Sequence, residues 1–153
     1  MSIEVGKKAP DFKLFDTQER EVSLDDFRGS KVVLFFYPKA NTSGWANEVT
    51  AFRDAEGEIN SLGAKILGIS KDSIKKQKNF KEKYELPFEL LSDEDEKICN
   101  AYGVIKEKSM YGKKYMGIER TTFIIDEEGL IKKVFEKVKV AGHEKQVIEA
   151  LKE

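Results

Sequence analysis

The stretch NTSGWANEV, residues 41–49, lies between an apolar segment and the expected first turn of a helix. Main-chain N–H groups converge at a helix N-terminus and favour an anion or a thiolate, so α/β proteins commonly place reactive groups at such a junction. The position that would suit a reactive side chain holds Trp45. An indole is neither a nucleophile nor an acceptor of oxygen, so we expect no covalent chemistry from this residue.

Cysteine and histidine chemistry is restricted because the chain contains one residue of each type, Cys99 and His143. This pair excludes an intrachain disulfide, a cysteine-rich metal site and a Cys/His nucleophile constellation. We therefore expect no metal and no cofactor. Cys99 lies in a short helical segment, which favours a small buried hydrophobe over a reactive thiol. His143 follows a glycine ahead of a terminal helix, which favours a solvated cap residue.

The charge balance argues against nucleic-acid and membrane partners. Lys plus Arg number 27 against 28 Asp plus Glu, so the formal net charge of -1 creates no bulk field that attracts a polyanion. The first residues, MSIEVGKKAPDF, lack the pattern of a signal peptide, and no apolar run is long enough to span a bilayer. We expect a soluble, cytoplasmic protein. Its length suits a single domain over 1–153.

The first two thirds of the chain alternate between strand and helix patterns. KVVLFFYP and AKILGIS are apolar runs of strand length. Between them, Trp45, Val49 and Phe52 recur at helical spacing and share one face of a helix. We expect strands over 31–38, 64–70 and 88–93. We also expect a helix that is capped at Thr42 or Ser43 and ends near Gly63, and further helices over 73–84 and 94–102.

The remaining segments predict two hairpins and a closing helix. ERTTFIID and LIKKVFEKV flank the short turn EEG, a pattern typical of an antiparallel hairpin, and residues 143–152 predict a helix. Residues 11–15 and 20–23 predict an N-terminal hairpin, followed by a helical turn in SLDDF. The lysine-rich segment 106–117 predicts a solvated loop rather than a partner contact. This order indicates an α/β, thioredoxin-like sandwich with a central mixed sheet flanked by helices.

Three segments carry a resemblance to a known family: FYPKANTSGW, LSDEDEKICNAYGV and GIERTTFIIDEEGLI. They resemble the bacterioferritin comigratory protein, or peroxiredoxin Q, branch of the peroxiredoxins, and the similarity covers essentially the whole chain. The resemblance implies the thioredoxin-like peroxiredoxin fold and, for the family, thiol-dependent reduction of hydrogen peroxide and organic hydroperoxides in antioxidant defence. It also implies peroxides and a thioredoxin-type reductant as partners, and a monomer or weak dimer.

The family motif is Pro, three residues, Thr, two residues and Cys. The resemblance places Pro38 and Thr42 in register and puts Trp45 at the position of the peroxidatic cysteine. The resolving cysteine of many members falls at Thr50, and Glu48 matches an acidic residue on the same helix. Neither cysteine position of the family therefore carries sulfur in this chain.

The remaining matches are Arg120, in ERTTF, which corresponds to the arginine beside the peroxidatic sulfur, and Cys99, which corresponds to a third cysteine of some members. A thiolate at a helix N-terminus beside an Arg cation has a lowered pKa, and the Thr42 hydroxyl can accept the peroxide proton or donate to the developing oxyanion. Pro38 would limit backbone freedom and shield the pocket. Without sulfur at position 45, no sulfenic acid forms there.

The resemblance thus predicts a peroxiredoxin that is inactive as written. It is either a natural pseudo-peroxidase or a chain whose nucleophile was replaced, and Ala46 and Thr50 beside Trp45 favour the natural variant. We expect the indole to pack with its helix face rather than to stack on a ligand. Arg120, without a thiolate, is expected to hold an anion or to pair with a carboxylate such as Glu48.

Two rival readings remain. The first is a non-catalytic binding or interaction module that holds a small anion or a partner surface in the pocket of Pro38, Thr42, Trp45 and Arg120. The second keeps thiol chemistry and moves the nucleophile to Cys99.

Overall fold

The computed structural model describes residues 4–37, 43–136, 138 and 142–152, and for residues 43–46, 108–110 and 115 it describes the backbone alone. The strands are β1 (Lys13–Phe15), β2 (Glu21–Ser23), β3 (Lys31–Phe36), β4 (Ala64–Ser70), β5 (Glu89–Ser92), β6 (Ile105–Met110), β7 (Lys113–Ile118), β8 (Thr121–Ile125) and β9 (Ile131–Phe135). The helices are the 3₁₀ helix η1 (Leu24–Phe27), α1 (Ser43–Ser61), α2 (Ile74–Tyr84), α3 (Lys97–Ala101) and α4 (His143–Lys152).

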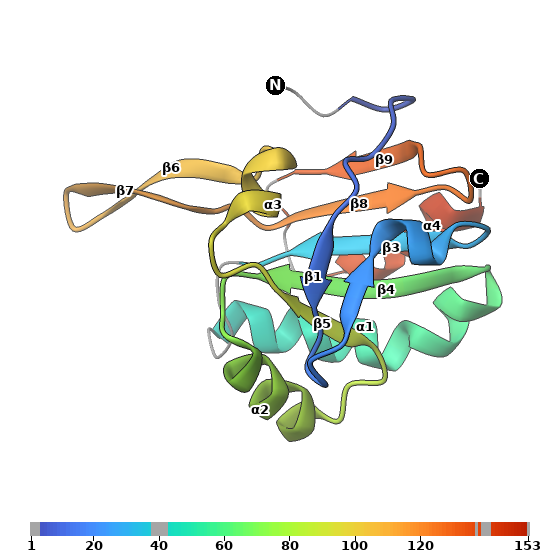
Figure 1. Ribbon diagram of the computed structural model, residues 1–153, viewed down its shortest axis with the longest axis horizontal. Helices are drawn as coiled ribbons and strands as arrows, with labels where there is room; N and C mark the ends of the chain where they lie inside the picture. The colour runs from blue at the N-terminus through green and yellow to red at the C-terminus, as the bar shows by residue number, and fades with distance from the viewer. Residues whose placement is uncertain (1–3, 38–42, 137, 139–141, 153) are drawn as a thin grey trace.

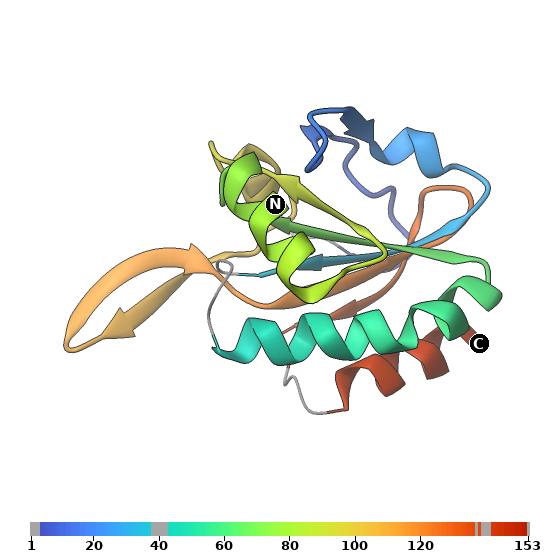
Figure 2. The same cartoon turned by 90° about the horizontal axis from the view of Figure 1, so that it is seen from below.

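A seven-stranded mixed sheet in the order β2-β1-β5-β4-β3-β8-β9 forms the centre of the molecule (Figure 1). Strands β3, β4 and β5 pair in parallel, and the pairs β1–β5, β3–β8 and β8–β9 are antiparallel. Helices α1 and α4 lie on one face, while the N-terminal hairpin, η1 and α3 cover the other (Figure 2). The thioredoxin-like α/β sandwich that the sequence predicts is confirmed.

Strand β3 contributes to a hydrophobic core on each face of the sheet. Because successive side chains of a strand point to opposite faces, Val33 and Phe35 join the cluster under α1 and α4, whereas Leu34 and Phe36 join the cluster on the other side. All of these side chains are buried. A strand that is buried on both faces has to be central in the sheet, which explains the unbroken apolar run VVLFF that follows Lys31.

The predicted elements largely match the observed ones. Strand 64–70 and helix 143–152 coincide with β4 and α4, and the N-terminal hairpin forms through β1 and β2. Ser73 caps α2 by accepting the N–H of Lys76 at 3.2 Å, which accounts for the start of that helix. No helix in the described part of the chain is long and apolar enough to cross a membrane.

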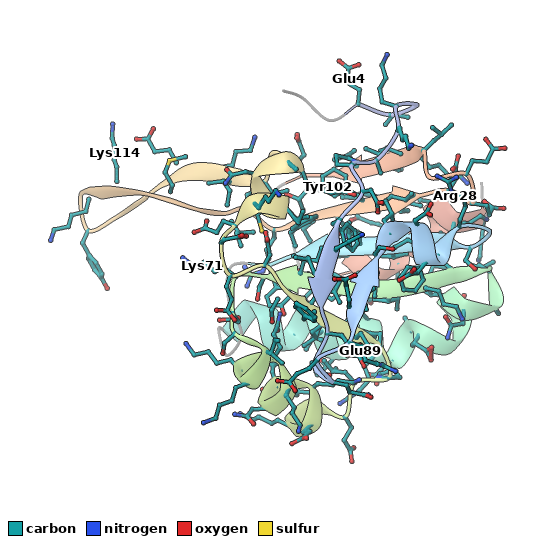
Figure 3. The ribbon with its side chains drawn as sticks, in the orientation of Figure 1. Glu4, Arg28, Lys71, Glu89, Tyr102 and Lys114 are labelled. Atoms are coloured by element: carbon teal, nitrogen blue, oxygen red, sulfur yellow. The ribbon has the colours of Figure 1, made fainter. Side chains whose placement is uncertain are left out.

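The prediction of a solvated loop over 106–117 was wrong, because this segment forms a two-stranded hairpin, β6–β7, that projects from the body (Figures 1 and 3). Tyr111 and Gly112 form its turn, with φ of 53° and 78°. Two consecutive residues with positive φ are typical of hairpin turns, but the first is usually Asn, Asp or Gly. A tyrosine there, among lysines of low strand propensity, concealed the hairpin in the sequence.

The prediction that His143 is a solvated cap residue was also wrong. Its side chain is 1 % exposed, and the ring lies edge-on to both Phe52 of α1 and Phe135 of β9. Nε2 lies 2.8 Å from the Thr122 hydroxyl and Nδ1 lies 3.2 Å from Oε1 of Gln146, so both ring nitrogens have polar partners. Burial lowers the pKa of His143. The docking of α4 on α1, which the local sequence does not reveal, decides this placement.

Candidate active site

The candidate site lies where β3 ends and α1 begins. Helix α1 starts at Ser43, so the backbone at position 45 belongs to its first turn. Pro38 and Thr42 lie outside the described residues, as does the side chain of Trp45. Their predicted contributions to the pocket stay predictions, while the end of β3 at Phe36 and the start of α1 at Ser43 are both described.

Glu48 and Arg120 are brought together across the fold. Glu48 lies in the second turn of α1, and Arg120 immediately precedes β8, which pairs with β3 and so reaches the same end of the sheet. Arg120 Nε lies 3.9 Å from Glu48 Oε2, an ion pair that is too long for a direct hydrogen bond. The Glu48 side chain is 2 % exposed and that of Arg120 is 24 % exposed.

The burial of Glu48 changes its acidity. Loss of solvent around the carboxylate raises the pKa of Glu48 to about 7, although the positive charge of Arg120 acts in the opposite direction. Desolvation therefore outweighs the attraction at this separation. The carboxyl group consequently changes its protonation state close to neutral pH.

This pKa predicts a pH dependence of stability. Because the folded pKa of about 7 lies above the ordinary value of 4.5, the contribution of Glu48 to stability is fully present below 4.5 and is lost as the pH rises through 7. The full loss corresponds to about 3 kcal/mol. Chemical denaturation at pH 5 and pH 8 should show that Glu48→Gln removes most of this decline.

The matched control is Glu58→Gln, which alters an exposed glutamate on the same helix. This variant should retain the decline between the two pH values. An identical pH dependence in the original chain and in Glu48→Gln would contradict the assigned protonation behaviour.

A buried polar network supports the junction from beneath, and the sequence analysis missed it. The Tyr37 hydroxyl donates to Oε1 of Gln77, and Gln77 Nε2 donates to the Ser70 hydroxyl at 3.2 Å and to the Leu91 carbonyl at 2.9 Å. Ser70 in turn donates to Asp72 Oδ2 at 3.0 Å. The network connects the carboxyl ends of β3 and β4 to β5 and α2, so it fixes the chain directly before Pro38.

One signal for this network was visible in the sequence. Gln77 occupies the inward face of α2, an otherwise lysine-rich helix whose Phe80 packs into the core. An uncharged polar residue on an apolar face indicates a buried hydrogen-bond partner. Burial also raises the pKa of Tyr37 far above its ordinary range, so the phenol remains a hydrogen-bond donor.

Cys99, the only cysteine, lies in α3 in the core cluster on the face of the sheet opposite α1. It is 0 % exposed, and its backbone N–H donates to Asp93 Oδ2 at 2.7 Å. Burial, together with Asp93, raises the pKa of the thiol far above its ordinary range. The thiol is therefore protonated and inaccessible.

Thr50, the resolving position, is the other candidate residue that the structure describes. Thr50 lies on α1, and its hydroxyl donates to the Asn47 carbonyl at 3.2 Å within the same helix. Among the residues that the structure describes, no three His, Cys, Asp or Glu side chains are grouped so as to hold a metal ion.

Comparisons with known proteins place this architecture in a family. The AhpC/TSA family profile matches residues 5–134. The chain is 54 % identical to a bcp peroxiredoxin of Coxiella burnetii over 148 residues, covering 97 % of this chain and 98 % of that protein. Peroxiredoxin Bcp of Bacillus subtilis is 46 % identical, covering 100 % of this chain and 98 % of its own length.

A solved structure agrees with these sequence relatives. The bacterioferritin comigratory protein of Xanthomonas campestris, whose structures address alkyl peroxide reduction by that protein, matches with a TM-score of 0.91 at 42 % identity. The match covers 97 % of this chain and 98 % of that chain. The chain described here therefore belongs to the AhpC/TSA family, and within it to the peroxiredoxins of the bacterioferritin comigratory protein, or peroxiredoxin Q, type.

Proposed function

We propose that this chain is a pseudo-peroxidase, a peroxiredoxin that has kept the family scaffold and lost its thiol chemistry at position 45. The family reaction uses a peroxide and a thiol reductant, and it begins with attack of a cysteine thiolate on the peroxide. Trp45 supplies no sulfur for that step, and Thr50 supplies none for a resolving step. Pro38, Thr42, Glu48 and Arg120 remain as the rest of the family pocket.

The observation that carries this proposal is the state of the only thiol in the chain. Cys99 lies in the core on the face of the sheet opposite α1, and burial raises its pKa far above neutrality. Cys99 has no exposed surface that a peroxide could contact, and burial keeps the thiol protonated. These two features argue against a nucleophile that has moved to Cys99.

A second candidate function is supported by the ion pair of Glu48 and Arg120. Because the pKa of Glu48 is about 7, the carboxylate only partly compensates the guanidinium charge near neutral pH. A small anion would find a cation there at the end of β3. This favours a non-catalytic binding module that uses Arg120 with Pro38, Thr42 and Trp45.

A peroxide turnover assay tests the proposal. The purified chain is given hydrogen peroxide or cumene hydroperoxide, with dithiothreitol or a thioredoxin system as reductant, and peroxide consumption is followed. We expect no turnover above the rate without protein. Cys99→Ser is assayed in parallel: turnover that disappears in this variant would place the chemistry at Cys99, and turnover that survives would contradict the pseudo-peroxidase assignment.

A further inference from the structure

A cavity of about 180 Å³ opens at the end of the sheet opposite the candidate active site. It lies between the N-terminal segment around residues 8–11, the segment 24–30 that contains η1, and the turn between β8 and β9. Figure 1 shows η1 and this turn at the right-hand end of the sheet, where β3 begins and β8 ends. Arg120 and the start of α1 belong to the other end, so this pocket is separate from the family site.

Backbone hydrogen bonds fix the positions of the pocket walls. Ala9 donates its N–H to the Gly129 carbonyl at 2.9 Å, and Gly29 donates its N–H to the Glu127 carbonyl at 2.9 Å. Both the N-terminal segment and the η1 segment are thus fastened to the β8–β9 turn, with the cavity between them. Because the walls are already ordered, ligand binding would cost little conformational entropy.

The floor of the pocket is apolar. Ala9, Leu24, Val32 and Ile125 line it, and all four are buried side chains of the core. The volume slightly exceeds that of an engineered apolar cavity of about 150 Å³ that binds benzene. The space therefore suits one aromatic ring or a short branched aliphatic group.

The aspartates on the rim already have partners. The carboxylates of Asp11 and Asp126 accept backbone N–H groups from their own turns, at 2.8 and 2.9 Å. Asp25 forms an ion pair with Arg28, with Oδ1 3.2 Å from Nε. Each of the three carboxylates thus has one oxygen engaged by a donor of this chain.

Two cations on the rim, Lys8 and Arg28, still have donor groups that could bind a ligand. Lys8 makes no hydrogen bond or ion pair within the described part of the chain, and it lies on the N-terminal wall. Arg28 lies on the η1 wall, where Figure 3 labels it, and its Nη2 is 4.0 Å from the position that a Cβ atom would take at Gly129. Since Asp25 engages Nε, the terminal guanidinium nitrogens remain positioned over the pocket for a planar oxyanion.

We propose that this pocket binds a small hydrophobic carboxylate, a molecule with one aromatic ring or branched apolar group and a single carboxylate. The apolar body lies on Ala9, Leu24, Val32 and Ile125, and the carboxylate lies against Arg28 and Lys8. The site is independent of position 45 and of the pseudo-peroxidase assignment. It gives a chain without a peroxidatic thiol a ligand site that the family chemistry does not use.

The test uses benzoate as the probe and the whole chain as the receptor. Titrations followed by ¹H–¹⁵N correlation spectra compare benzoate with benzyl alcohol, benzylamine and acetate. Benzoate should cause saturable shifts of the amides of Ala9, Gly29 and Gly129, with an affinity about tenfold above that of benzyl alcohol, the factor expected for a hydrogen bond to a charged group. Acetate, which lacks the apolar body, should bind more weakly than benzoate.

Two substitutions locate the carboxylate. Arg28→Gln should reduce benzoate affinity about tenfold and leave benzyl alcohol affinity unchanged, because only the charged partner is lost. Lys8→Gln should also weaken benzoate, whereas the matched control Lys7→Gln alters an exposed neighbour outside the pocket and should have no effect.

Three results would overturn the proposal: benzylamine binding at least as tightly as benzoate, unchanged benzoate affinity in Arg28→Gln, or shifts confined to amides around Glu48 and Arg120. The last result would indicate binding at the family site instead. None of these outcomes depends on the peroxide assay, so failure of this proposal is distinguishable from failure of the pseudo-peroxidase assignment.

Discussion

Trp45→Cys is expected to reduce hydroperoxides at least about 10³-fold faster than the unaltered chain, since removing a covalent nucleophile typically costs this much or more. Position 45 lies in the first turn of α1, and Arg120 forms an ion pair with Glu48 in the second turn of the same helix. A helix N-terminus and a nearby guanidinium both favour a thiolate. The new thiol should therefore titrate below the usual pKa of about 8.5. Peroxide consumption with a thiol reductant, and alkylation rate against pH, measure the two effects.

Trp45→Ser is the matched control. It removes the indole, as Trp45→Cys does, but introduces a hydroxyl in place of a thiol of similar size. It should remain inactive, and the double variant Trp45→Cys with Cys99→Ser should keep the restored activity. A new thiol that titrates like free cysteine and ignores peroxide would show that the surrounding residues no longer form a peroxidase site.

Trp45→Ala is expected to lower the free energy of unfolding by about 3 to 5 kcal/mol, the range for truncating a buried aromatic residue. Position 45 precedes Val49 by one helical turn and Phe52 by two, and both of those side chains are 0 % exposed in the core under α1. An apolar residue on this stripe gains about 25 cal/mol for each Å² that it buries. The family resemblance implies that active members unwind this turn during their cycle, and a packed indole would oppose such unwinding.

Two measurements examine this prediction. Chemical denaturation gives the loss of stability, and amide exchange reports opening of the first turn, where the amides of residues 44–50 should exchange slowly in the original chain and faster in Trp45→Ala. A loss below about 1 kcal/mol, the size of an ordinary substitution, would place the indole at the surface and favour a role in contacting a ligand or partner.

Local patterns were enough for most elements of the fold. The run AKILGIS is apolar at nearly every position, which only a central strand tolerates at that length, and it became β4 without change of bounds. The predicted helix over 73–84 corresponds to α2, Ile74–Tyr84, which Ser73 caps in the structure. The β6–β7 hairpin was missed because Tyr111 takes a backbone conformation that its residue type rarely adopts.

The sequence by itself determined the fold class, the peroxiredoxin resemblance and the absence of sulfur at positions 45 and 50, because these depend on residue type and local periodicity. Only the tertiary structure decided which residues meet. The antiparallel pairing of β8 with β3 brings Arg120 to Glu48, and the docking of α4 on α1 buries His143. The acidity of Glu48 also depends on the tertiary structure. Nothing in the sequence distinguishes this residue from an ordinary glutamate, and its pKa rises to about 7 because folding removes the water around the carboxylate.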